Sequence, residues 1–460
     1  MVLHHFLFSR NKKIKKIGKT QANKKGMTKT STSCLLLLQL CAMAATEPSA
    51  DEPALAQCTS GAADGSVSIS KNKGVRLRKQ PSGLHFVAST NRGATYAESF
   101  EQAMIELKRW AATQGEAMEQ KLKGAIEHVA VTYIMTDGSL DRGRSKGHYL
   151  DAASIPDQIT AIARLLPKAM TDEIDDKRTF GRLAKEAGVE GTVVPRTFES
   201  AAEAFEVLAA DPAASDIVFV KSAHGSGGDA ITVERTTDLK TLILPRHHII
   251  QEGVTSKSRG VYKLRAFVIV HGGKLYLSKN FHGYRDEGTP TPEMLAAYSP
   301  EMLAFVSSRN LTAQHVNQHW DSTIDRHTFW AKMGGRTIAA AEAPHRQEWT
   351  ASMAAATKRM APMFKLLVTA TANDPYRYHL LGIDVIPRED HSVRIIEVNP
   401  FPGVHWDHMN FSGIDFDFLP EDQKFERNEV CKEQNGAFVS ILKLLFGMPI
   451  EDGLIDVSGV

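Results

Sequence analysis

Residues 379–403, HLLGIDVIPREDHSVRIIEVNPFPG, constrain the fold of this chain more than any other stretch. Runs of Leu, Ile and Val on both sides of a charged, proline-containing turn predict two strands, residues 380–387 and 393–399. Side chains alternate between the two faces of a strand, so Glu397 and Asn399 point to the same side. The sequence therefore predicts a β-hairpin with polar side chains gathered on one face.

The register of this hairpin decides whether a third polar side chain joins that face. If the turn closes near Pro387 and Ser392, Asp384 lies opposite Ile395 and shares the face. Two carboxylates and an amide oxygen together suit a hard cation such as Mg²⁺. A surface hairpin with a solvated polar face is the alternative. Apolar residues at the intervening positions favour a strand buried on its other face, and so favour the metal site.

The N-terminal residues 1–46 differ in composition from the rest of the chain. They hold nine of the 55 Lys and Arg residues and no acidic residue, which leaves 46 basic and 53 acidic residues elsewhere. This mildly acidic remainder argues against a nucleic-acid-binding surface. The apolar run at residues 34–43 is too short for a stable membrane span and has the length of a signal-peptide core. We expect a signal or organelle-targeting peptide, with a disordered tail of a cytoplasmic protein as the alternative.

The whole chain has the length and composition of a soluble protein of two or three domains. It has 460 residues, of which 42% are hydrophobic and 23% charged. Only Cys58 and Cys431 lie beyond residue 46, and no CxxC pattern is present. The cysteines therefore form neither a disulfide framework nor a zinc-binding pattern.

A buried strand at residues 216–222 is predicted to end in Lys221, and a glycine-rich loop follows it. P-loops and dinucleotide-binding loops open a helix, whereas here a second strand resumes at residues 230–234. A glycine loop between antiparallel strands can close over phosphates, because no Cβ keeps its N–H groups away. A tight hairpin turn is the alternative. Lys221 favours the phosphate site, since a lysine ending a buried strand requires an anionic partner.

The remaining predicted elements alternate between helix and strand, which predicts an α/β (α+β) fold. The predicted helices are residues 96–126, 176–187, 200–210, 292–308, 346–372 with a break at Pro362, and 436–446, with residues 410–433 irregular. The predicted strands are residues 129–135, 248–254, 264–270 and 274–281.

In this order the segments resemble the ATP-grasp superfamily, and within it most closely the tubulin–tyrosine ligase-like proteins. Residues 379–403 are similar to the family pattern x-G-x-D-hydrophobic…L-x-E-V-N-x-x-P-G, and residues 310–317 are similar to its H-L-T-N-x-x-x-x-K segment. The resemblance covers roughly residues 166–403. It implies an ATP-grasp architecture, with a nucleotide held between two α/β subdomains that follow a smaller N-terminal α/β domain.

Composition and resemblance together divide the chain into a targeting or disordered segment (1–46), a linker (47–74), an N-terminal α/β domain (75–170), a central ATP-grasp subdomain with the glycine loop (171–254) and a C-terminal ATP-grasp subdomain with the metal hairpin (255–450).

The resemblance implies that ATP and Mg²⁺ are bound, and assigns roles position by position. The implied Mg²⁺ ligands are Asp384, Glu397 and Asn399. The residues implied to bind ATP are Lys177, Lys221, Gly225, Ser226, Gly227, Gly228, Gln251, Glu252, Val254 and Thr312. The residues implied to contact the transferred phosphate or the substrate are Lys221, Arg265 and Arg285.

The chain departs from the family at the strand that carries Arg265. The family's K-F-D-L-R is Val-Tyr-Lys-Leu-Arg here, so Lys263 stands where the family has Asp. We expect Lys263 on the opposite face of the strand from Arg265. The departure leaves the metal and phosphate residues intact, but tubulin as the substrate does not follow.

The implied activity is that of an ATP-dependent carboxylate–amine ligase. A carboxylate attacks the γ-phosphorus to give an acylphosphate and ADP, and an amine then displaces phosphate. The expected partners are a protein or peptide substrate, with tubulin one possibility, and an amino acid. Two alternatives stay open: an ATP-grasp kinase that phosphorylates a small polyol such as an inositol phosphate, and a non-catalytic nucleotide-binding or cytoskeleton-binding module.

Overall fold

The computed structural model has a mixed α/β fold, as the sequence predicts. The strands of the described residues form two sheets, one of ten strands and one of four. All described residues belong to one compact unit, Gln57–Val460. Within this part of the chain, no helix is both long and apolar enough to cross a membrane. The structure describes residues 75–89, 93–134, 150–224, 231–254, 261–286, 335–340, 343–403 and 421–459.

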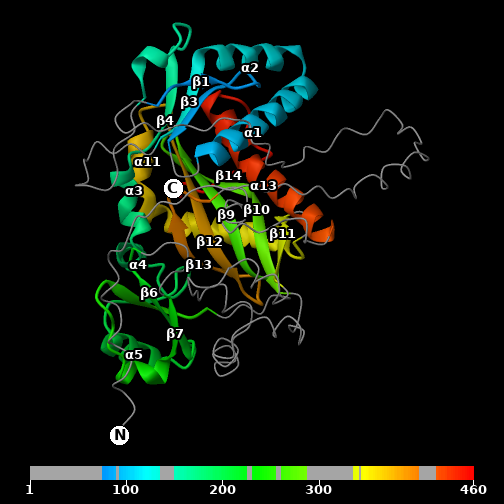
Figure 1. Ribbon diagram of the computed structural model, residues 1–460. Helices are drawn as coiled ribbons and strands as arrows, with labels where there is room; N and C mark the ends of the chain where they lie inside the picture. The colour runs from blue at the N-terminus through cyan, green and yellow to red at the C-terminus, as the bar shows by residue number, and fades with distance from the viewer. Residues whose placement is uncertain are drawn as a thin grey trace, which may run out of the picture. The chain divides into compact units, whose positions relative to one another are not determined.

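The larger sheet joins strands from both ends of the described chain (Figure 1). Its order is β1-β2-β3-β4-β12-β9-β10-β11, with β13 paired to β12 and β14 paired to β10. The earlier strands are β1 (Arg78–Lys79), β2 (His85–Ser89), β3 (Val129–Ile134) and β4 (Ala161–Leu165). The later strands are β9 (Val261–His271), β10 (Lys274–Asp286), β11 (Gly335–Ala339), β12 (Arg377–Pro387), β13 (Val393–Asn399) and β14 (Leu454–Asp456).

Strand β12 is central, because β9 pairs with one of its edges and β4 and β13 pair with the other. It is buried at ten of its eleven positions. The alternative of a solvated surface hairpin is therefore wrong.

The predicted hairpin of β9 and β10 is also confirmed, and its turn residues Gly272 and Gly273 have φ of 57° and 75°. Glycine adopts these angles without steric cost.

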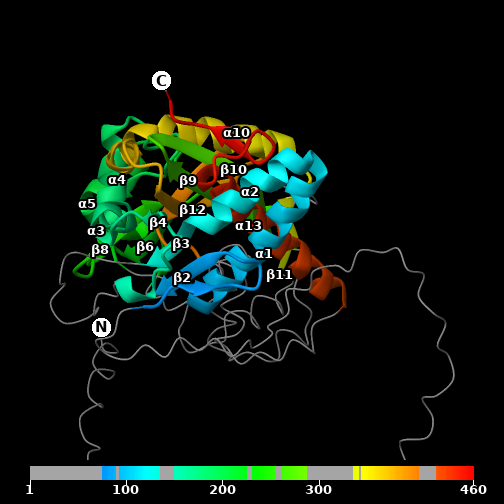
Figure 2. The same ribbon diagram turned by 90° about the horizontal axis from the view of Figure 1, so that it is seen from above.

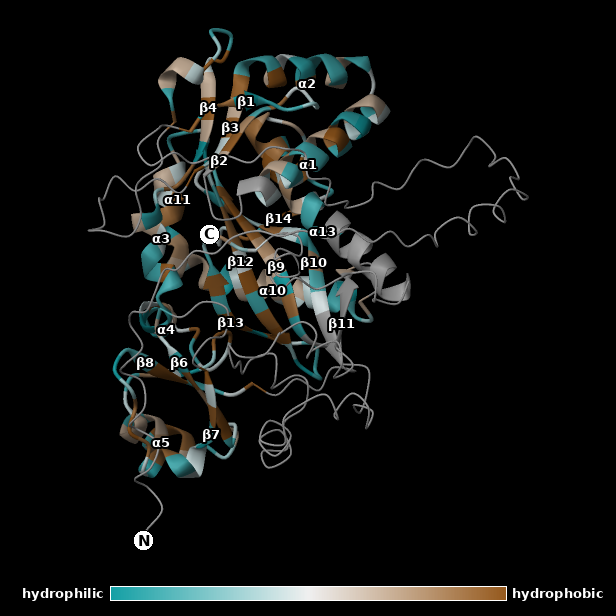
Figure 3. Cartoon of the chain, viewed as in Figure 1, coloured by the Kyte–Doolittle hydropathy of each residue, from teal (hydrophilic) through white to brown (hydrophobic). Residues whose placement is uncertain are grey.

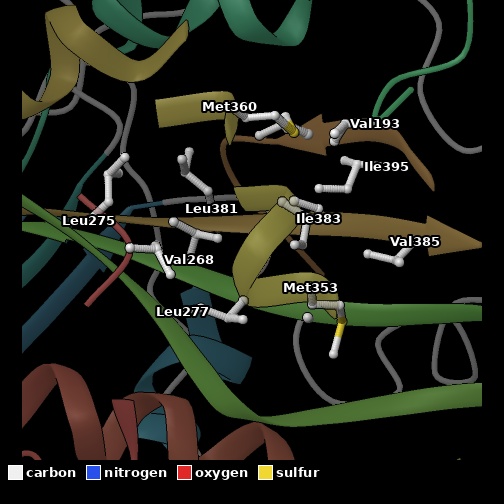
Figure 4. Packing of buried hydrophobic residues seen from close by; sticks show 14 of the residues in the cluster. Val193, Val268, Leu275, Leu277, Met353, Met360, Leu381, Ile383, Val385 and Ile395 are labelled. Carbon is white, nitrogen blue, oxygen red and sulfur yellow. The ribbon is translucent and has the colours of Figure 1, made fainter. Parts of the chain in front are cut away.

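One face of the larger sheet is covered by α10 (Arg346–Met360) and α11 (Lys365–Thr371). Figure 4 shows Ile383 and Val385 of β12 on the side where Met353 of α10 packs. Burial of apolar side chains on this scale is the main stabilising contribution to the sheet. Leu381, Ile383 and Val385 of β12 thus pack in the cluster beneath these helices.

The opposite face is covered by α1 (Gly93–Gln114) and α13 (Glu421–Leu445), which lie side by side (Figures 1 and 2). They pack on even-numbered residues of β12, including Tyr378 and Leu380. Further along the same strand this face turns polar at Asp384. The candidate site is therefore on the face that α1 and α13 share.

The smaller sheet has the order β5-β8-β6-β7. Its strands are β5 (Thr197–Phe198), β6 (Ile217–Ser222), β7 (Thr232–Arg235) and β8 (His248–Glu252). Helix α5 (Ala201–Ala209) covers one face, where Val218, Val220 and Ile250 are buried. Figure 3 shows this sheet as largely hydrophobic, in contrast to the mixed colouring of α1 and α2 (Glu116–His128). The other face carries Phe219, Lys221 and Gln251, which the register places together.

The helices follow the predictions with three differences, the first of which is α3 (Lys168–Asp175), a helix that was not predicted. The helix predicted for residues 96–126 is divided into α1 and α2 at Gly115, whose φ of 97° is unfavourable for other residues. Helix α13 begins at Glu421, so the prediction of an irregular stretch up to residue 433 is wrong there. The predicted break at Pro362 is confirmed, because a 3₁₀ turn, Ala361–Phe364, separates α10 from α11. The predicted helix at residues 292–308 lies outside the described residues.

Candidate functional site

A β-bulge in β13 sets the geometry of the predicted metal hairpin. Near the turn, Val385 pairs with Ile395, but one step further Asp384 pairs with Glu397, so Ile396 is the extra residue. The predicted pairing of Asp384 with Ile395 is therefore wrong. Without the bulge, Asp384 would lie opposite Ile396 and away from Glu397. Because of it, Asp384, Glu397 and Asn399 share one face, as predicted.

Asp384 is 1% exposed and is held by two cationic side chains of β9. Arg265 donates through Nε to one carboxylate oxygen and through a terminal nitrogen to the other, the latter at 3.0 Å. The Lys263 ammonium lies 3.1 Å from Oδ2 of Asp384. Burial raises the pKa of the Asp384 carboxyl, but Arg265 and Lys263 outweigh burial and hold that pKa well below its usual range.

Lys263 and Arg265 lie on the same face of β9, so the expectation that they lie on opposite faces is wrong. Residues two apart in a strand point to the same side, and both of these side chains contact Asp384. Alternation along the strand was the signal that should have placed Lys263 in the site. Behind this pair His282 is buried, and burial together with Arg265 lowers its pKa to about 3, so the imidazole is neutral.

Glu397 and Asn399 form the more open side of the site. The Glu397 side chain is 29% exposed and lies 4.0 Å from the Lys177 ammonium. Asn399 donates from Nδ2 to Oε1 of Glu397 at 3.3 Å. Lys177 is the first residue of α4 (Lys177–Glu186), whose N-cap Asp176 accepts a hydrogen bond from the Thr179 N–H.

Lys177 is also fixed to the smaller sheet, because its backbone N–H donates to the carbonyl of Ala223 directly after β6. This bond places the start of α4 beside the end of the strand that carries Lys221. Both lysines therefore approach the metal hairpin from the same side of the fold.

Lys221 connects the smaller sheet to the larger one. This lysine is 5% exposed, and its ammonium donates to Oε1 of Gln251 at 2.7 Å. Gln251 in turn donates from Nε2 to the carbonyl of Ile396, the bulge residue, at 3.2 Å. The bulge thus sets the face of Asp384 and also supplies the acceptor that orients Gln251. Neither role could be assigned from the sequence of either segment alone.

Burial lowers the pKa of Lys221 from 10.5 to about 8. Glu397 opposes this shift, and Lys177 and Lys263 add to it. A carboxylate outside this group, that of Asp175, interacts with Lys177 and Glu397. Lys177, Lys221, Lys263 and Arg265 converge on two further carboxylates, those of Asp384 and Glu397. We call these six residues the inter-sheet cluster. Its excess of positive charge favours an anionic ligand.

The other predicted nucleotide residues are placed only in part. Glu252 is paired with Arg196, with nitrogen–oxygen distances of 2.7 and 2.8 Å. Val254 lies two residues after the end of β8 in a partly exposed position. Arg285 belongs to β10, but its side chain is not among those described. The residues outside the described part of the chain are Gly225, Ser226, Gly227, Gly228 and Thr312.

The site residues fit a divalent cation only in part. Glu397 and Asn399 offer a carboxylate and an amide on a partly exposed face, which suits Mg²⁺. Asp384 does not fit as well, because Arg265 and Lys263 hold both of its oxygens. Among the described residues there is no group of three or more His, Cys, Asp or Glu side chains that could hold a metal. Asp384 as a metal ligand therefore stays a prediction.

A cavity of about 390 Å³ lies elsewhere, between β1, β2, α1 and α2. Its lining includes Leu122 and Ile126 together with charged residues of both signs, such as Lys79 and Glu127. None of the residues of the inter-sheet cluster lines it, so the cavity is separate from the candidate site.

The fold and the cluster define a mixed α/β protein in which cationic side chains from two sheets meet two carboxylates. No protein-family model matches the sequence, and no curated protein matches it. Among solved structures, the chain is similar to the C-terminal domain of Pby1 from K. lactis, an ATP-grasp enzyme that interacts with the mRNA decapping enzyme Dcp2. The identity is 13% and the TM-score 0.38, over 82% of this chain and 98% of that chain. A likeness at this level carries no conclusion about function.

Proposed function

We propose that the inter-sheet cluster binds the polyphosphate of ATP and that the protein is an ATP-grasp enzyme. The observation that carries this proposal is the convergence of Lys177 and Lys221 with Lys263 and Arg265 around Asp384 and Glu397. The ammonium of a lysine that is 5% exposed, with a pKa lowered to about 8, is costly to bury unless an anion joins it. A triphosphate supplies that charge.

The proposed reaction is the ligation of a carboxylate to an amine, as in tubulin–tyrosine ligase-like proteins. A substrate carboxylate attacks the γ-phosphorus, ADP leaves, and an amine then displaces phosphate from the acylphosphate. Lys221 and Arg265 stabilise the negative charge that develops on the transferred phosphoryl group. Gln251 fixes the position of Lys221 before ATP arrives, so no reorganisation is required. A Mg²⁺ ion bound by Glu397 and Asn399 would neutralise phosphate charge.

The proposed substrates are a protein or peptide and an amino acid. The support is the sequence resemblance at residues 379–403, together with the shared face of Asp384, Glu397 and Asn399. Of the two segments expected to read the acceptor, residues 261–285 lie in β9 and β10, and residues 310–317 lie outside the described residues. Tubulin is therefore one candidate among acidic protein substrates.

A second candidate is a non-catalytic nucleotide-binding module. The contact between Lys263 and Asp384 favours the non-catalytic module, because an ammonium then lies beside the carboxylate at which a ligase is expected to hold Mg²⁺. In that case ATP binds but is not consumed, and binding alone changes the affinity for a partner.

The test is ATP consumption by the full chain with Mg²⁺ and a panel of amino acids and acidic peptides. Mass spectrometry identifies any product that has gained a residue, and hydroxylamine traps an acylphosphate as a hydroxamate. A ligase gives both signals. Phosphate stably esterified to an alcohol would show a kinase instead, and ATP binding without turnover would show the non-catalytic module.

The matched variants are Lys221→Met and Lys240→Met. Both lysines lie over a phenylalanine ring, Lys221 at 5.4 Å from the Phe219 centroid and Lys240 at 4.6 Å from that of Phe205. We expect Lys221→Met to lose turnover by about 100-fold or more, and Lys240→Met to keep it. Equal activity of the two variants would exclude Lys221 from the reaction.

A further inference from the structure

The carboxylate of Asp384 is occupied by cations of the protein itself. Arg265 binds both of its oxygens, and the Lys263 ammonium lies 3.1 Å from Oδ2. The side chain of Asp384 is 1% exposed and that of Lys263 is 16% exposed, so water screens this pair only weakly. A divalent cation at Asp384 would have to approach within a few ångströms of two positive charges.

The lysine takes the position through the register of the central strands. Asp384 pairs with Arg265 across β12 and β9, so the side chains of both residues lie on one face. Lys263 is two residues from Arg265 on β9 and points to the same face, beyond Arg265. The Lys263 ammonium lies 3.1 Å from Oδ2 of Asp384, a typical distance for an ion pair.

Glu397 remains accessible in a way that Asp384 does not. Its side chain is 29% exposed, and the Lys177 ammonium is 4.0 Å away. Asn399 lies beside it. The two carboxyl groups, which share a hydrogen bond, therefore differ in their surroundings: that of Asp384 is buried and paired with two cations, whereas that of Glu397 is partly exposed with one ammonium at 4.0 Å.

We propose that Lys263 replaces a divalent cation at Asp384, so that the site takes a single Mg²⁺, at Glu397 and Asn399. The lysine then acts as a permanent counter-ion of Asp384 and determines how many metal ions the site binds. It also keeps the site positively charged before the nucleotide arrives. The nucleotide part of this inference rests on the proposed function, whereas the competition between Lys263 and a metal at Asp384 does not.

The experiment measures Mn²⁺ binding to the full chain by electron paramagnetic resonance, first alone and then with the non-hydrolysable nucleotide AMP-PNP. The variant is Lys263→Gln, and Lys263→Arg is its charge-conserving partner. A matched control is Lys274→Gln, which breaks another lysine–aspartate pair, with Asp456 at 2.9 Å, in the neighbouring strand. Thermal unfolding checks that each variant is folded.

We expect Lys263→Gln to bind Mn²⁺ at least about ten-fold more tightly than the wild type without nucleotide, since a positive charge is removed from a poorly screened site. With AMP-PNP it should bind two Mn²⁺ per chain where the wild type binds one. Lys263→Arg and Lys274→Gln should behave as the wild type. Adding Asp384→Asn to Lys263→Gln should abolish the gain.

Unchanged Mn²⁺ affinity in Lys263→Gln, or a gain that persists with Asp384→Asn, would overturn the inference. Two Mn²⁺ ions in the wild type with AMP-PNP would overturn it as well. Absence of nucleotide binding would count against the proposed function alone, because the comparison with Mn²⁺ and no nucleotide still decides whether Lys263 excludes a metal from Asp384.

Discussion

Deprotonation of Lys221 should weaken ATP binding between pH 7 and pH 9. Burial lowers the pKa of this lysine to about 8, so most of the free protein loses the charge over this range. A bound triphosphate favours the ammonium and raises its pKa in the complex. Linkage of one proton then predicts an affinity about ten-fold lower at pH 9 than at pH 7.

The lowered pKa of Lys221 also makes the folded protein more stable as the pH rises, whereas ATP binding becomes weaker. Unfolded, Lys221 keeps its ordinary pKa of 10.5, whereas in the folded protein the pKa is about 8. Between these two pH values the unfolded chain holds one more proton than the folded chain, so the free energy of unfolding rises with pH. At about 1.4 kcal/mol per pKa unit, the rise amounts to roughly 3 kcal/mol. Lys221→Met should remove this rise.

The assay is isothermal titration of ATP into the full chain at pH 7 to 9, in two buffers of different ionisation enthalpy. Near pH 8.5 the difference between the buffers should show uptake of a proton on binding. Lys240→Met should show the same pH dependence as the wild type. An affinity that does not change between pH 7 and 9, or proton uptake that persists in Lys221→Met, would refute the reasoning.

Three further predictions concern the supports of the cluster. Asp384→Asn should lower the free energy of unfolding by about 3–5 kcal/mol at pH 7, because two cations lose their counter-charge. The pKa of Asp384 is held below its usual value, so the stability that this carboxylate contributes is lost as the pH falls below about 4. In urea titrations at acidic pH, the variant should therefore lose less stability than the wild type. Gln251→Leu should cost about 1–3 kcal/mol in chemical denaturation and weaken ATP binding, because the ammonium of Lys221 loses its acceptor; unchanged ATP affinity would contradict the positioning role. Gly382→Ala should cost about 1–3 kcal/mol in calorimetry, because its Cβ would lie 2.6 Å from Cβ of Pro402; an unaltered melting temperature would show that the Pro402 loop moves aside freely.

Local patterns in the sequence predicted the elements that carry the site. Runs of Leu, Ile and Val on both sides of a charged turn located β12 and β13, and the Gly272–Gly273 pair located the hairpin of β9 and β10. A lysine ending a buried strand correctly marked Lys221 as a buried ammonium. These features depend on residues close together in the chain, which is why they could be predicted.

The exact pairing in the metal hairpin could not be predicted in the same way. One additional residue, Ile396, changes which side chain faces Asp384, and alternation alone does not reveal where a strand bulges. The bridge from Lys221 through Gln251 to the carbonyl of Ile396 joins residues far apart in sequence. Such contacts depend on how two sheets pack, and periodicity carries no information about it.

The placement of Lys263 beside Arg265, by contrast, could have been predicted from the sequence. Its spacing of two residues from Arg265 is sufficient to place both side chains on one face, whereas the family pattern has an Asp at this position. The structure shows that this charge pairs with Asp384. A departure from a resembled pattern can therefore define the chemistry of a site as firmly as a match.

The most direct test of the central claim compares the affinities of ATP and adenosine for the full chain by isothermal titration. Four of the six residues of the inter-sheet cluster are cationic, so binding should depend on the phosphates. ATP should bind at least about 100-fold more tightly than adenosine, since several charge-assisted hydrogen bonds are lost with the phosphates. Lys221→Met should lose most of this difference and Lys240→Met should keep it. Equal affinities for ATP and adenosine, or no binding of ATP, would contradict a polyphosphate site between the two sheets.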